Sequence, residues 1–215
     1  MQHFDKQDPI YLLSLKTGIE VKFIKQLQYE TKSYPKRLKR DFTATLLSKE
    51  LFNFDEIPEG KTVELPGVSF KLASEDEGFK IISKLRKETE AKNYRIFLDI
   101  YYSNDIDKSV DLSIISCNND FDPLVYMHTN GINYGITNQK LIDELRILDK
   151  SLGLKILGAG EDWCEFEITK EPESWFVIIR KIFELCPDIA EKYDYSLEDF
   201  KTCLIKTRKL YLWFD

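Results

Sequence analysis

The chain has 215 residues, of which 43% are hydrophobic and 32% charged, values typical of a globular protein that buries a core. Its net charge of −6 disfavours general binding to nucleic acid or to anionic lipid. No stretch approaches the ~20 apolar residues that span a bilayer, and the N-terminus lacks the apolar region of a secretion signal. We therefore expect a cytoplasmic protein with a protein partner, and neither nucleic acid nor a membrane.

The four cysteines are Cys117, Cys164, Cys186 and Cys203, and no two of them form a C-x-x-C pair. This spacing suggests neither a zinc ribbon nor thioredoxin chemistry. We expect buried thiols in a reducing compartment, with no metal or cofactor.

The N-terminal residues predict short elements. Asp8-Pro9 is a typical helix start and Thr17-Gly18 a typical stop, so a helix is expected over 9–16. Residues 19–29 have a mixed apolar period that permits a strand but favours a second helix. The basic segment 32–40 is expected to be a solvated connection.

The middle of the chain alternates apolar strand patterns with turn signals and one helical period. Ser74 and Glu77 form a capping box at the start of the helix. Asn118-Asn119-Asp120 has the composition of a hairpin turn. The expected elements are strands at 61–65 and 68–73, separated by a Pro66-Gly67 turn, a helix at 75–92, and strands at 94–102, 110–117 and 123–128.

The last 85 residues show the clearest pattern, and here Thr137 and Gly153 bracket a helix with one leucine-rich face. The expected elements are a short strand at 131–136, that helix, strands at 154–159 and 163–168, a helix from Pro172 to Cys186, a helix from Ser196, and a final strand at 209–214.

These elements predict an α+β fold with an antiparallel or mixed sheet and helices packed on one face. In the C-terminal part they follow a β-α-β-β-α-(α)-β order, which is typical of a ferredoxin-like layer. We expect a partly helical N-terminal extension, residues 1–66, on an α+β domain formed by residues 67–215.

Four sequence segments occur in a fixed order: HTNGINYGITNQKLIDEL (128–145), GAGEDWCEFEI (158–168), ELCPDI (184–189) and LYLWFD (210–215). Together they resemble the bacterial family known as domain of unknown function 4253 (DUF4253). The resemblance is weaker upstream and extends over residues 67–215. The chain departs from the family at Phe214, where a tryptophan is more usual, and this aromatic exchange leaves the packing unchanged.

The resemblance implies a cytoplasmic module of bacterial type and assigns no catalytic residue. No P-loop is present, and Gly158-Ala159-Gly160 is followed by Trp163 where a dinucleotide-binding loop requires a third glycine. A hairpin turn explains these glycines better than a nucleotide site.

Five polar residues form a candidate site for a small enzyme. His128 is the one side chain there that titrates near neutral pH, and it stands close in sequence to other polar residues. Turn and cap chemistry explains the same residues structurally, and a Cys164 or Cys186 nucleophile paired with His128 has no support in the spacing. The candidate residues are His128, Asn133, Tyr134, Asp162 and Glu165.

The acidic residues at 161–167 are open to a second interpretation as a magnesium site, for which Asp99 or Asp188 would supply further ligands. Carboxylates on the solvent side of a strand are much commoner than metal sites, so we expect no bound metal.

The strands at 163–168 and 209–214 also carry a candidate partner surface. Alternation places Cys164, Phe166 and Ile168 in the core and leaves the intervening residues in solvent. Exposed aromatic residues among carboxylates are typical of a protein-binding surface. The candidate residues are Glu161, Trp163, Glu167, Tyr211 and Trp213.

Residues 12–27 fit a helix-turn-helix pattern followed by the basic segment 32–40. Glu20 at the start of the supposed recognition helix and the acidic remainder of the chain argue against DNA binding. The leading hypothesis is therefore a non-enzymatic protein-binding module, of the immunity or accessory type, followed by a small enzyme and then by an N-terminal DNA-binding segment.

Overall fold

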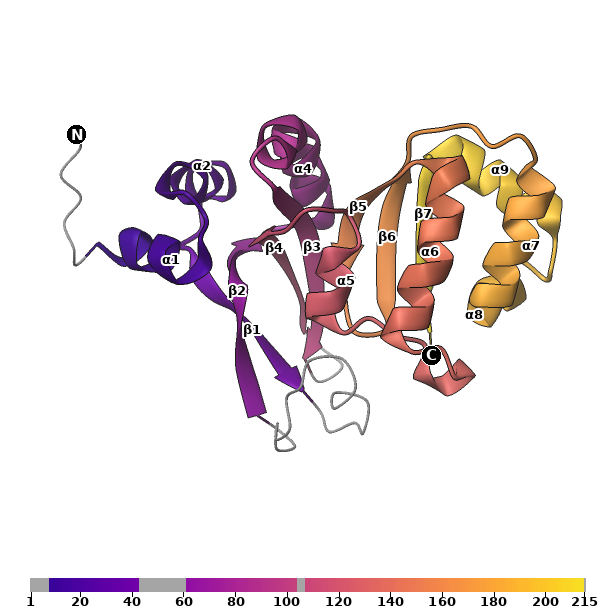
Figure 1. Ribbon diagram of the computed structural model, residues 1–215, viewed down its shortest axis with the longest axis horizontal. Helices are drawn as coiled ribbons and strands as arrows, with labels where there is room; N and C mark the ends of the chain where they lie inside the picture. The colour runs from indigo at the N-terminus through magenta and orange to yellow at the C-terminus, as the bar shows by residue number, and fades with distance from the viewer. Residues whose placement is uncertain (1–7, 43–60, 104–106, 215) are drawn as a thin grey trace. The chain divides into compact units, whose positions relative to one another are not determined.

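The computed structural model describes residues 8–42, 61–103 and 107–214, except for side chains at some strand ends (Figure 1). The chain divides into two compact units, Met1–Asn119 and Asp120–Asp215. We call them the N-terminal unit and the C-terminal unit and describe each by itself.

The two units differ in charge. The C-terminal unit has 18 Asp/Glu against 12 Lys/Arg and so carries a net charge of −6, whereas the N-terminal unit has 19 of each and is neutral. The boundary expected between residues 66 and 67 falls within one continuous strand, Lys61–Leu72. The division into an extension, residues 1–66, and a domain, residues 67–215, stays a prediction.

The N-terminal unit contains an antiparallel sheet in which the strands are ordered β1-β2-β4-β3. Its described elements are α1 (Pro9–Thr17), α2 (Val21–Thr31), β1 (Lys36–Phe42), β2 (Lys61–Leu72), α4 (Glu75–Glu90), β3 (Tyr94–Ser103) and β4 (Asp107–Ser116).

The predicted helices of this unit are confirmed. Asp8 caps α1, and in α4 the Ser74 hydroxyl accepts a hydrogen bond from the backbone N–H of Glu77. Helices α2 and α4 lie side by side (Figure 1) and are joined by ion pairs such as Lys84–Glu30, with the atoms 2.6 Å apart. Charged side chains of α2 therefore contact α4 within the same unit.

Two predictions for this unit are wrong. The basic segment 32–40 is not a solvated connection throughout, because from Lys36 onward it forms β1, which pairs with β2 and buries Leu38 and Arg40 on either side of the exposed Lys39. Pro66-Gly67 is not a turn, because β2 continues through it and is paired on both sides. An irregular pairing between Arg37 and Lys39 accommodates the proline, and a Cβ at Gly67 would lie 2.8 Å from Leu38 and Ile115.

The C-terminal unit contains the antiparallel strands β5-β6-β7, with α5 and α6 in front of them and α7 to α9 beside β7 (Figure 1). Its elements are α5 (Asp122–Met127), the 3-10 helix η1 (Ile132–Tyr134), α6 (Asn138–Leu152), β5 (Leu154–Ala159), β6 (Trp163–Ile168), α7 (Trp175–Leu185), α8 (Pro187–Lys192), α9 (Leu197–Thr207) and β7 (Lys209–Trp213).

The predicted helix α6 and the three strands are confirmed, and with them the α+β fold class. The four leucines of α6 share one buried face, since they recur at the spacing of helical turns. Cys164 and Phe166 on β6, and Leu210 and Leu212 on β7, are completely buried on the core side of the strands.

Three local predictions for this unit are wrong. Residues 123–128 form helix α5, because Pro123 suits a first helical turn and Leu124 and Met127 are buried one turn apart. Residues 131–136 form η1, closed by a single bridge between Gly131 and Ile136. The first strand of the expected ferredoxin-like layer is therefore missing. Helix α8 was not predicted, and α7 begins at Trp175 instead of Pro172.

Candidate functional site

The pairing of β6 with β7 brings five sequence-predicted residues to one face of these strands. Trp163 lies opposite Trp213, and Glu165 lies opposite Tyr211. Glu167 lies opposite Lys209 on the same face. We call this surface the aromatic face, because its indole and phenol rings adjoin one another.

The rings of the aromatic face form a continuous row. The centroid of Tyr211 lies 5.9 Å from that of Trp163 and 5.6 Å from that of Trp213. Trp163 is 5% exposed and Tyr211 is 40% exposed. The expectation that Trp163 faces solvent is thus wrong, and Tyr211 offers the most exposed ring of this row.

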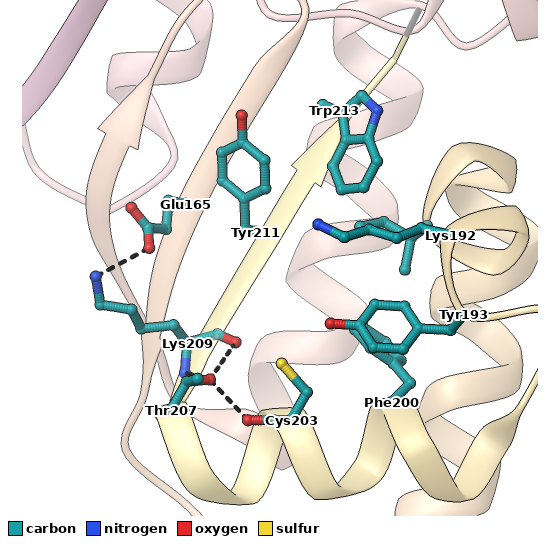
Figure 2. A pocket seen from close by; sticks show the side chains of 10 residues that line it. Glu165, Lys192, Tyr193, Phe200, Cys203, Thr207, Lys209, Tyr211 and Trp213 are labelled. Carbon is teal, nitrogen blue, oxygen red and sulfur yellow. Dashed lines mark hydrogen bonds and ion pairs between the residues drawn. The ribbon is translucent and has the colours of Figure 1, made fainter.

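A pocket of about 190 Å³ opens beside the aromatic face, between β7 and the helices α8 and α9 (Figure 2). Its strand wall and its helix wall both contribute aromatic rings. Tyr193 and Phe200 are in contact in the helix wall, with ring centroids 4.9 Å apart. The residues that line the pocket are Glu165, Ile189, Lys192, Tyr193, Phe200, Cys203, Thr207, Lys209, Tyr211 and Trp213.

Two lysines and one glutamate supply the charges of the pocket. The ammonium of Lys209 lies 3.1 Å from a carboxylate oxygen of Glu165, so this pair is neutral as a whole. The ammonium of Lys192 lies 4.7 Å from the ring centroid of Trp213 and has no ion-pair partner among the described residues. The pocket therefore has a net positive charge within an acidic unit.

Cys203 lines the pocket together with Tyr193 and Thr207. Burial, reinforced by a hydrogen bond with Cys203, raises the pKa of Tyr193 to about 12. The Thr207 hydroxyl donates to the Cys203 carbonyl at 2.8 Å and accepts from the Lys209 backbone N–H at 3.3 Å. The Tyr193 phenol therefore adds no charge to the pocket at neutral pH.

A second cluster joins the segments that carried the family resemblance, and we call it the motif junction. It consists of Thr129, Gly131, Asn138, Gly160 and Cys186. The Thr129 hydroxyl donates to the Gly160 carbonyl at 2.5 Å. The Asn138 amide donates to the carbonyls of Leu124 and Thr129 at 2.9 and 2.7 Å. These buried donors fix the loop before α6 against the turn before β6.

Two glycines of the motif junction are required by close aromatic packing. A Cβ at Gly160 would lie 2.0 Å from the indole nitrogen of Trp163, and one at Gly131 would lie 2.6 Å from the Phe214 ring. Both separations are much shorter than van der Waals contact. The motif glycines are therefore explained by packing, without a nucleotide.

Cys186 closes the motif junction on the side of β7. Its thiol donates to the Trp213 carbonyl at 3.0 Å, which satisfies an acceptor on the outer edge of β7. Burial raises the pKa of Cys186 to about 11 and raises that of Cys164 well above its usual range. Both thiols thus stay protonated at neutral pH, which is the opposite of what a cysteine nucleophile requires.

The candidate polar site draws on two segments, 128–134 and 162–165, which meet where the Asn130 backbone N–H donates to the Glu161 carbonyl at 2.8 Å. His128 ends α5 in a left-handed conformation, and the Asp162 carbonyl accepts from the Phe214 backbone N–H at 2.8 Å. Tyr134 donates to Asp188 on α8, whereas Glu165 lines the pocket. Asn133 is exposed in η1, within the same loop as Tyr134.

The partner of Tyr134 is Asp188, at the start of α8, which is not among the residues that line the pocket. Ile189, Lys192 and Tyr193 share the pocket face, because they are one helical turn apart. Asp188 precedes Ile189 and accepts a hydrogen bond from the Tyr134 hydroxyl. Its hydrogen bond raises the pKa of Tyr134 to about 12, which makes this phenol a poorer acid.

Sequence reasoning found the strand wall of the pocket but missed its helix wall. Tyr211, Trp213 and Glu165 were predicted as site residues and lie in the strand wall. Lys192 and Tyr193 were missed because helix α8 was not predicted. A signal was available in Pro187 followed by an apolar pair, Ile189-Ala190, which is typical of a short helix.

The structure offers no support for the magnesium hypothesis. Within residues 8–42, 61–103 and 107–214, no three His, Cys, Asp or Glu side chains are grouped to hold a metal ion. Asp99 belongs to β3 of the N-terminal unit, where burial raises its pKa to about 7.

None of the helices in the described part of the chain has the length and hydropathy needed to cross a membrane.

Comparison with protein families identifies one match. The family described as Domain of unknown function (DUF4253) matches residues 111–215, a range that begins in β4 and includes the whole C-terminal unit. Residues 67–110, where the resemblance is weaker, lie outside this match. No curated protein and no solved structure matched the chain. The match confirms the resemblance seen in the four motif segments and extends it over residues 111–215.

Proposed function

We propose that the C-terminal unit is a non-enzymatic protein-binding module, and that it recognises its partner through the aromatic face and the adjoining pocket. One observation carries the proposal. A half-exposed tyrosine, Tyr211, stands between two tryptophan rings at the mouth of a pocket that is itself walled by aromatic side chains.

The size of the pocket favours a partner's side chain over a cofactor. Sites for drug-sized ligands and cofactors usually enclose roughly 300–1,000 Å³. The pocket of about 190 Å³ is smaller and suits a single anchoring side chain. Aromatic residues around such pockets carry most of the binding free energy in many protein interfaces.

The alternative of a small enzyme has weaker support. Burial keeps the thiols of Cys164 and Cys186 protonated, and the hydrogen bond with Asp188 makes Tyr134 a weaker acid. DNA binding has weaker support too. Lys92 of the N-terminal unit pairs with Glu20 at 3.1 Å, at the start of the helix that would enter the groove.

We also place the module in a reducing compartment of a bacterial cell, where it would act as an immunity or accessory protein. Its four cysteines are free thiols, and three of them are buried. The net charge of −6 on the C-terminal unit supports a protein partner over nucleic acid.

The test is affinity capture of partners from native lysate with the tagged full chain and with a Tyr211→Ala variant. Ile147 on α6 provides a matched control, because it is 42% exposed and Tyr211 is 40% exposed. We expect a stoichiometric partner that is retained by Ile147→Ala and lost by Tyr211→Ala. Equal retention by both variants would show that the aromatic face is not the binding surface.

A further inference from the structure

The chemistry of the pocket points to the kind of group that it binds. Figure 2 shows the ammonium of Lys192 pointing into the space between Tyr211 and Trp213, above the ring of Tyr193. The ammonium lies 4.7 Å from the Trp213 centroid, and both residues line the pocket. A group that fills the pocket would thus lie between aromatic walls and beside one cation.

The charge balance selects an anionic group. Lys209 is paired with Glu165, and it also lies opposite Glu167 in the strand register. Lys192 is the other lysine of the pocket, and its positive charge is not balanced by these pairs. A second cation would be repelled by Lys192 and would find the Trp213 ring already occupied.

The geometry favours the end of a peptide over an internal segment. In an extended chain successive side chains point to opposite sides, so an acidic neighbour of a buried ring would point away from the pocket. The α-carboxylate of a C-terminal residue is instead attached to the same Cα as the side chain. One residue can then place its ring between the walls and its carboxylate at Lys192.

We propose, building on the protein-binding function above, that the pocket binds the C-terminal residue of a partner protein, with an aromatic side chain against Tyr193 and Tyr211 and the free α-carboxylate paired with Lys192. Backbone carboxylate capture of this kind is a known mode of peptide recognition.

The experiment titrates the isotope-labelled full chain with three acetylated dipeptides and follows the indole N–H resonance of Trp213 by NMR. The probes are acetyl-Gly-Phe with a free carboxylate, the same peptide with a C-terminal amide, and acetyl-Gly-Ala with a free carboxylate. We expect saturable shifts of the Trp213 resonance with the phenylalanine acid. The amide should bind on the order of tenfold more weakly, because it lacks the charged contact with Lys192.

The variant Lys192→Met keeps the aliphatic stem of the side chain and removes its charge. We expect it to bind the phenylalanine acid and the amide equally. Lys150→Met, an exposed lysine in the last turn of α6, is the control and should keep the preference for the acid. Circular dichroism of both variants verifies that they fold.

Several results would overturn the inference. They are equal affinity of the acid and the amide for the unmodified protein, a preference that survives in Lys192→Met, no saturable shift at Trp213, or stronger binding of phenethylamine than of the acid. If Tyr211→Ala still abolished lysate capture in those cases, the proposed protein-binding function would be retained. Only the recognition of a C-terminal aromatic residue would be rejected.

Discussion

The motif junction and the aromatic pocket lie in the same unit and share Trp213, yet their chemistry differs. In the motif junction the Trp213 carbonyl accepts a hydrogen bond from a buried neutral thiol, Cys186. In the pocket the Trp213 indole lies beneath the ammonium of Lys192 and adjoins the half-exposed Tyr211. The motif junction buries neutral donors and glycines, whereas the pocket presents rings and charges to solvent.

This difference separates residues that hold the fold from residues that can meet a partner. The motif segments supply the motif junction and the strand wall of the pocket. In the helix wall, Lys192, Tyr193 and Phe200 lie outside those segments. We therefore expect motif substitutions to act mainly on stability and substitutions in the pocket to act mainly on binding.

The largest loss is expected for Asn138→Leu. The substitution leaves the carbonyls of Leu124 and Thr129 buried without their donor, at a cost of about 1–3 kcal/mol each, so we expect a total of about 3 kcal/mol. All three tryptophans belong to the C-terminal unit, so their fluorescence during urea unfolding reports this unit. Asn133→Leu, at an exposed position, is the control and should change stability by less than about 0.5 kcal/mol.

Gly160→Ala should cost about 2 kcal/mol, because the new methyl group displaces the buried Trp163 indole. Gly135→Ala is the comparison, since nothing lies within 4 Å of its Cβ, although its φ is +66°. The strain of that left-handed backbone alone should cost about 1 kcal/mol. A smaller loss at Gly160 than at Gly135 would refute the role of close packing in the motif junction.

The pH dependence of stability should reveal Cys186. Its pKa in the folded protein, about 11, lies above the usual value of 9.0, so the unfolded chain loses this proton first as pH rises. The contribution of the thiol is complete below pH 9 and is lost as pH approaches 11, and we expect it to amount to about 1–2 kcal/mol. The variant Cys186→Ala should show a shallower decline over that range in urea titrations. Parallel curves for the two proteins would contradict this assignment.

The smallest effect on stability is expected in the pocket. Tyr211→Ala removes a side chain that is already 40% exposed, so we expect a loss below about 1 kcal/mol. Its effect on partner affinity should instead exceed about 2 kcal/mol, as is usual for an aromatic hot spot. Calorimetry of the captured partner with the variant and with the unmodified protein measures this change in binding free energy directly. A large stability loss with unchanged affinity would reverse the comparison.

The sequence predicted those parts of the fold that have a long and regular pattern. The leucines of α6 recur over four turns between Thr137 and Gly153, and β6 alternates buried and polar residues, so both elements were located correctly. In β1 the burial of Leu38 and Arg40 on either side of the exposed Lys39 could not be predicted, because the sequence does not distinguish a buried arginine from a solvated one.

Local sequence patterns could not predict the helix wall of the pocket. Helix α8 has six residues, too few for a helical period to be recognised. The position of Lys192 above Trp213 depends on how α8 packs against β7, and these residues lie 21 positions apart in the sequence. Strand alternation alone was sufficient to place Tyr211 and Trp213 on one face.

The most direct test of the account is site-specific photocrosslinking in native cells. A photoreactive phenylalanine analogue is placed at position 211 in one variant and at position 147 in another, which compares two sites of equal exposure. We predict that position 211 crosslinks to one defined protein partner and that position 147 does not. Crosslinking of the same partner at position 147 with none at position 211 would show that the aromatic face is not where this protein binds.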